Sequence, residues 1–195
     1  YHFVFVLDTT QSTDTDRFKI WVNGEQITSF DTTVWPVQDA DYGINNTVNH
    51  SLGVKIANSS SYMSMYLAEV HFIDGTALDA SSFGETDAAT NQWKPIDASG
   101  LTFGTNGFYQ KYSSTELAAS FTDSAEGRVV TANGNVHTDT SVKKIGTASA
   151  QFDGSGDSLS IPDSTDFDFD TNDFTVECWV NGDINTSDYQ GIIGN

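Results

Sequence analysis

Short apolar runs separated by polar turns are the dominant pattern of this sequence. Residues 1–7 are apolar at almost every position and rich in aromatic and β-branched side chains, which predicts a strand covered on both faces. Phe18, Ile20 and Val22 then alternate with their neighbours, and Asn23-Gly24 supplies the two positive-φ residues of a tight hairpin. The N-terminal part is therefore predicted to be antiparallel β-structure.

The middle of the chain repeats this pattern with longer turns. Residues 29–61 read as long loops around one apolar run, Leu52 to Ile56. Residues 66–73 alternate strictly, which places Tyr66, Ala68, Val70 and Phe72 on one face of a strand and Glu69 and His71 on the other. Residues 77–85 are the only plausible helical turn.

The last predicted strand, residues 174–180, contains Cys178, which alternates with apolar neighbours. Cys178 is the chain's single cysteine, so it is predicted to be a small buried hydrophobe and no intrachain disulfide can form.

Composition narrows the possible partners. The 195 residues include 27 acidic and 8 basic side chains, for a formal net charge of −19. Phosphate backbones and anionic membranes both need clustered Lys and Arg, so we expect no nucleic acid partner and no membrane partner. No apolar run approaches the ~18 residues of a membrane span. The acid excess has two interpretations: solubility in a salty medium, or Asp-lined loops that bind hard cations.

Three stretches resemble parts of a known superfamily. Residues 152–162 with 174–180 are similar to the opening motif of laminin G-like and pentraxin-like modules of the concanavalin A-like lectin superfamily. Residues 66–78 resemble a closing strand of these modules, with Ala68 in place of the usual Asp, and residues 4–7 with 18–24 resemble a hairpin of the same modules. The resemblance implies an all-β fold, an antiparallel β-sandwich of the jelly-roll type, which often binds glycans and often Ca²⁺.

The order of these motifs predicts an unusual domain organisation. Residues 1–113 are expected to be the C-terminal part of one module, 114–117 a linker, and 118–195 the N-terminal part of a second module. Each part alone would expose sheet edges and half a core. The favoured interpretation is a piece of a longer repetitive chain, and the alternative is that both parts complete one sandwich in permuted order.

Two sets of candidate ligand-binding residues follow from the loops. Flat aromatic side chains on loops are how many lectins hold sugars, so Trp35, Tyr42 and Trp93 are candidate glycan-binding residues, against the alternative that each is buried under its loop. Carboxylates that alternate with Phe167 and Phe169 could share one face and bind Ca²⁺, although an exposed edge with both rings buried gives the same pattern. The candidate calcium ligands are Asp163, Asp166, Asp168, Asp170 and Asp173.

No catalytic constellation is predicted. Glu69 to Asp74 invites comparison with the E-x-D-x-x-E strand of laminarinase-type glycoside hydrolases, but His71 replaces the middle Asp and Asp74 falls in a turn. A retaining glycosidase needs two carboxyls ~5 Å apart. Glu69 is therefore predicted to be a solvated or loop-pinning residue.

Residues 72–85 and Trp93-Lys94-Pro95 resemble repeats in tail fibres and other surface appendages of bacteriophages, particularly marine ones. This resemblance implies a non-catalytic structural and glycan-recognition part of a virion surface appendage or another extracellular structure. The expected partners are host-surface glycans and other appendage subunits in a homo-oligomer. A secreted or surface-anchored bacterial adhesin is the alternative, and a laminarinase-type hydrolase is a third possibility.

Overall fold

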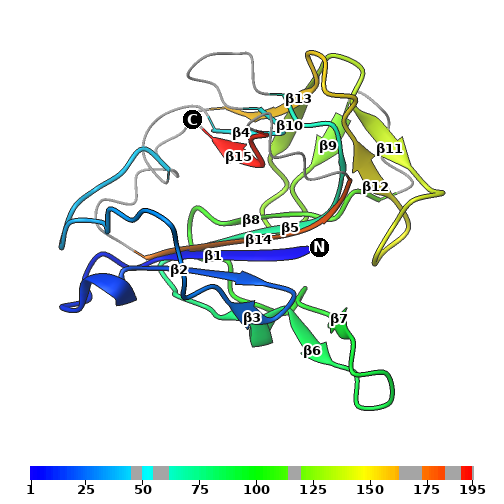
Figure 1. Cartoon of the computed structure of the whole chain (residues 1–195). Helices are drawn as coiled ribbons and strands as arrows, with labels where there is room; N and C mark the ends of the chain where they lie inside the picture. The colour runs from blue at the N-terminus through cyan, green and yellow to red at the C-terminus, as the bar shows by residue number, and fades with distance from the viewer. Residues whose placement is uncertain (45–49, 55–61, 114–119, 163–172, 183–189, 195) are drawn as a thin grey trace.

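The computed structural model describes residues 1–44, 50–54, 62–113, 120–162, 173–182 and 190–194. These residues form antiparallel sheets, two of which face each other across a large hydrophobic core (Figure 1). The predicted all-β antiparallel sandwich is confirmed. Its finer description as a jelly roll stays a prediction.

The larger sheet has β14 near its centre. Its strand order is β11 (His137–Asp139), β12 (Ser149–Gln151), β5 (Tyr66–Asp74), β14 (Phe174–Asn181), β1 (His2–Leu7), β2 (Phe18–Val22) and β3 (Glu25–Gln26), with β8 (Phe108–Gln110) also paired to β5.

The second sheet and several short elements make up the rest of the described structure. The facing sheet contains, in order, β15 (Ile193–Gly194), β4 (His50–Leu52), β13 (Ser158–Ile161), β10 (Val129–Asn133) and β9 (Ser120–Thr122). A separate hairpin pairs β6 (Gly84–Thr86) with β7 (Trp93–Pro95), and the described residues also include the short 3-10 helices η1 (Asp14–Asp16) and η3 (Ala80–Ser82).

Local predictions at the turns are confirmed. Asn23 and Gly24, between β2 and β3, have φ values of 51° and 84°, as the two central residues of a tight hairpin turn require. The helical turn predicted within residues 77–85 is η3, where the Asp79 carboxylate accepts the Ser81 backbone N–H.

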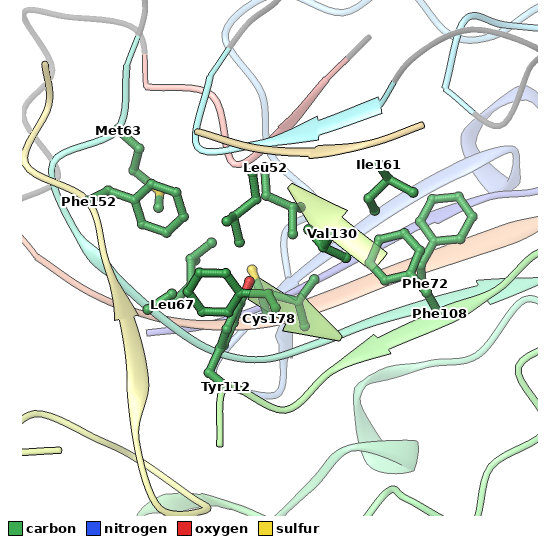
Figure 2. Packing of buried hydrophobic residues seen from close by; sticks show 14 of the residues in the cluster. Leu52, Met63, Leu67, Phe72, Phe108, Tyr112, Val130, Phe152, Ile161 and Cys178 are labelled. Carbon is green, nitrogen blue, oxygen red and sulfur yellow. The ribbon is translucent and has the colours of Figure 1, made fainter. Parts of the chain in front are cut away.

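The main core lies between the two sheets. Side chains from β5 and β14, such as Phe72 and Cys178, meet Leu52 and Val130 of the facing sheet (Figure 2). Cys178 is fully buried, which confirms its predicted role as a small hydrophobe.

The other face of the larger sheet is also covered. The connection from β5 to β8, which includes η3 and the β6–β7 hairpin, crosses this outer face (Figure 1). There Val4 and Val6 of β1 and Ile73 of β5 pack against Phe83 and Ala98 in a second cluster. Strand β1 therefore has apolar, covered side chains on both faces, as predicted for residues 1–7.

A β-bulge in β5 corrects the alternation predicted for this strand. Trp179 pairs with Ala68 and Glu177 pairs with His71, so two steps along β14 match three along β5. Glu69, inside the bulge, has a φ of 54°. Leu67 therefore packs in the main core with Val70 and Phe72. The prediction that Tyr66, Ala68, Val70 and Phe72 share one face is wrong, because Tyr66 and Ala68 are not part of that core.

Strands from both predicted modules share the two sheets. β14 lies between β1 and β5, with Val176 opposite both Phe5 and Phe72. β4, from the first part, likewise pairs with β13 and β15 from the second. Residues from both predicted parts therefore pair with each other within each of the two sheets. The predicted linker 114–117 lies outside the described residues, and the assignment of the parts to successive repeats stays a prediction.

Candidate functional site

A groove of about 420 Å³ lies at the end of the larger sheet where β1 begins. Ligand pockets commonly have volumes of roughly 300–1,000 Å³. Its aromatic walls include Trp93 of β7, Trp179 of β14 and Tyr66 of β5, and the connection between β11 and β12 closes another side. The N-terminus, β7 and β12 lie toward the same end of the molecule in Figure 1.

Polar side chains complete the groove. Asn23 and Asn181 supply amides, and Lys144 supplies an ammonium group. None of the described residues that line the groove is acidic. Amides donate and accept hydrogen bonds, so the groove combines flat apolar faces with groups that can bind hydroxyls.

Trp93 is held in place by backbone and side-chain contacts. A Cβ atom on Gly24 would lie 2.4 Å from the Trp93 ring, and a Cβ on Gly84 would lie 2.6 Å from it, so the indole packs directly on two glycines. Its Nε1–H donates a 2.9 Å hydrogen bond to Nδ1 of His2. These contacts fix the orientation of the ring.

Trp179 forms the floor of the same groove. Its side chain is 6% exposed and stacks on the His2 ring, with centroids 4.5 Å apart and planes inclined by 21°. The Lys144 Nζ atom lies 5.1 Å from the centroid of the Trp179 ring, within the range of a cation–π contact. His2 thus contacts both tryptophans.

A buried carboxyl–imidazole network lies beneath this floor. Glu177 Oε1 is 2.6 Å from His2 Nε2, and Glu177 Oε2 is 2.5 Å from His71 Nδ1. Burial lowers the pKa of His2 and of His71 to about 3, and burial raises the pKa of Glu177 well above its ordinary value. Both imidazoles are therefore neutral at neutral pH, and burial favours the protonated form of the Glu177 carboxyl.

The hydrogen bond from Trp93 fixes the tautomer of His2. An indole N–H can only donate, so Nδ1 of His2 is the acceptor and the proton of the neutral ring lies on Nε2. Nε2 faces Glu177. The network is enclosed under Trp179, so it supports the groove without lining it.

Glu69 was predicted to be either solvated or loop-pinning, and its burial rules out the solvated role. It is 4% exposed and accepts a short hydrogen bond from the Tyr109 hydroxyl. Burial raises the pKa of Glu69, and the Tyr109 hydrogen bond offsets part of that rise. Its carboxylate stabilises the bulge of β5 and does not line the groove.

The three aromatic candidates predicted for glycan binding lie in different places. Trp93 lines the groove, whereas Trp35 and Tyr42 lie on the segment that follows β3, near the opposite end of β1. Trp35 packs edge-on against Phe30, with ring centroids 5.8 Å apart. The Tyr42 hydroxyl accepts the Val37 backbone N–H, and its ring lines a separate apolar groove with Phe5.

Only one predicted calcium ligand, Asp173, is among the described residues. Asp163, Asp166, Asp168 and Asp170 lie outside them. Asp173 is close to Asp8, and burial together with the hydrogen bond and charge of Asp8 raises the pKa of Asp173 to about 7. Within the described part of the chain, no three His, Cys, Asp or Glu side chains converge in a way that could hold a metal ion. Calcium binding by these acids stays a prediction.

The sequence did not single out Trp179, Tyr66 or Lys144. A signal for Trp179 was present, because strand alternation places it on the opposite face from Val176 and Cys178. Tyr66 required knowledge of the bulge. Lys144 lies on a connection far from the other groove residues in sequence, so only the folded chain brings it there.

Comparisons with protein families, characterised proteins and solved structures find no match to this chain. Among the described residues, no helix has the length and hydrophobicity to cross a membrane. The groove and the residues that line it are therefore the structural basis for a function.

Proposed function

We propose that this chain is a saccharide-recognition β-sandwich and that the groove between Trp93 and Trp179 is its binding site. One face of many sugar rings carries C–H groups and packs on indole, while the hydroxyls at the ring edge need hydrogen-bond partners. The observation that carries the proposal is the pair of fixed indoles with Asn23 and Asn181 around one groove.

Binding without catalysis is the activity proposed. Glycoside hydrolysis needs a pair of carboxyls at the scissile bond. The described lining of the groove contains none, and Glu69 and Glu177 are buried outside it. This supports recognition over a hydrolase of the laminarinase type.

The biological setting that we propose is a virion surface appendage, such as a phage tail fibre that contacts host-surface carbohydrate. Its support is the resemblance of residues 72–85 and 93–95 to appendage repeats. Trp93, the residue of that block that lines the groove, connects the resemblance to the site. The alternative setting is a bacterial adhesin, which would use the same groove.

A glycan array followed by calorimetry tests the proposal. The wild-type chain is expected to bind a defined set of saccharides. Trp93→Ala is expected to bind at least about tenfold more weakly, because truncating a central aromatic anchor commonly costs more than about 1 kcal/mol. Asn181→Ala is expected to bind several-fold more weakly, because a hydrogen bond contributes about 1 kcal/mol. Trp35→Ala is the matched control and should bind as the wild type does.

Asn181→Ala guards against the case in which Trp93→Ala fails to fold. The Asn181 side chain is exposed, so removing it leaves the packing of the tryptophans unchanged. Thermal unfolding of each variant identifies loss of folding. Failure of the folded wild type to bind any saccharide overturns the proposal. So does binding that survives Trp93→Ala and Asn181→Ala but is lost in Trp35→Ala.

A further inference from the structure

We propose that the groove selects acidic saccharides and that Lys144, assisted by Lys143, binds a carboxylate or sulfate group on the sugar. This inference rests on the proposed saccharide-binding function and adds the class of saccharide to it.

The distribution of charge is the first observation. The chain has 8 basic side chains against 27 acidic ones, yet two consecutive lysines line this groove and none of its described lining residues is acidic. A net charge of −19 repels anions from most of the surface. Salt at physiological strength screens charges beyond roughly 8 Å, so an anion in the groove responds mainly to the local lysines.

The position of the ammonium groups is the second observation. The Lys144 Nζ atom lies over the face of Trp179, 5.1 Å from the ring centroid. The Lys143 Nζ atom donates a 2.6 Å hydrogen bond to the Thr140 carbonyl, which places it on the connection between β11 and β12. The Lys144 cation thus lies beside a ring that lines the groove, and Lys143 is the adjacent lining residue.

Three acidic groups on the elements around the groove have other partners. The Asp139 carboxylate, at the end of β11 just before the connection that carries the lysines, accepts hydrogen bonds from Ser141 and Val142. Glu69 accepts the Tyr109 hydroxyl, and Glu177 faces two histidines beneath the floor. None of these three carboxyls lines the groove, so both lysines can offer their charge to a ligand.

The test compares saccharides that differ only in charge. Binding of dextran, carboxymethyl-dextran and dextran sulfate, and of sialylated oligosaccharides with their desialylated forms, is measured by calorimetry. The acidic members are expected to bind roughly tenfold or more tightly than the neutral ones, as is typical when a hydrogen bond to a charged group is added. The carboxymethyl and sulfate arms show which anion is preferred.

Variants then connect the selectivity to the lysines. Lys144→Met, which keeps an apolar stem over Trp179, should lose the tenfold preference for the acidic members. Lys144→Arg should keep the preference. Lys19→Met is the matched control, because Lys19 lies on β2 and pairs with Asp16.

Each outcome decides between the two proposals. Equal binding of neutral and acidic saccharides, or a preference unaffected in Lys143→Met/Lys144→Met, overturns the charge selectivity while saccharide recognition stands. Absence of binding to every saccharide overturns the proposed function, and the selectivity with it.

Discussion

Glu177 and the rings around it show how single residues hold the groove. The Glu177 carboxyl faces His2 and His71, and His2 in turn contacts both Trp93 and Trp179. A buried polar group without a partner costs about 1–3 kcal/mol, so each member of this network depends on the others. The buried network of Glu177, His2 and His71 thereby sets the orientation of the two indoles.

Replacing Glu177 tests this dependence. Glu177→Ala removes the partner of two buried imidazoles and is expected to lower the free energy of unfolding by about 2–6 kcal/mol, because each unpaired ring nitrogen costs about 1–3 kcal/mol. Glu177→Gln is expected to cost only about 1 kcal/mol, because its amide can accept from His2 Nε2–H and donate to His71 Nδ1. Urea denaturation measures both. Equal losses in the two variants would mean that the network does not stabilise the fold in this way.

Asp173 makes the free energy of unfolding depend on pH. Its pKa is raised from 3.8 to about 7 in the folded state, so the folded chain binds a proton that the unfolded chain has released between these pH values. This group therefore lowers the free energy of unfolding as the pH rises from about 4 to about 7.

Asp173→Asn removes that titration. We expect the variant to gain stability relative to the wild type as the pH rises through this window, because an amide beside Asp8 carries no charge. Thermal unfolding at a series of pH values gives the difference, with the exposed residue substitution Asp31→Asn as control. A difference that is constant with pH would contradict the assignment.

At the scale of elements, much of the fold was predictable from periodicity. The apolar run of β1, the Asn23-Gly24 turn and the alternation of β14 each have a local physical cause, and the structure confirms all three. The bulge in β5 was not predictable, because Glu69 adopts a positive φ that its own sequence does not demand. Pairing with β14 and the Tyr109 hydroxyl fix it there, and both are distant in sequence.

The reactivity of the Cys178 thiol tests the placement of β14 between the sheets. Its thiol is fully buried between the sheets, and burial raises the pKa of the thiol well above its ordinary value. We expect negligible labelling by a thiol reagent in native buffer and full labelling in denaturant, because the thiolate is the reactive form. Ser12→Cys in a Cys178→Ser background places an exposed thiol on the same chain as the control. Native labelling of Cys178 as fast as this control would mean that β14 is not held between β1 and β5.

At the scale of the whole molecule, the candidate site is assembled from segments far apart in sequence. Trp93 was identifiable as a flat aromatic side chain in a loop-like stretch, but its neighbours come from β1, β5, β14 and the β11–β12 connection. The order of these segments along the chain does not indicate which of them lie close together in the folded molecule. Trp35 and Tyr42 illustrate the consequence, because the same reasoning selected them and the fold places them elsewhere.

The indole signals of a ¹⁵N-labelled sample test the central claim most directly. The chain has four tryptophans, Trp21, Trp35, Trp93 and Trp179, each with one Nε1–H that gives its own resonance. Titration with a saccharide found on the array should move the Trp93 and Trp179 signals together, with one dissociation constant, and leave those of Trp21 and Trp35 in place. Movement confined to Trp21 or Trp35, or four signals unchanged by a saccharide that binds, would contradict recognition in this groove.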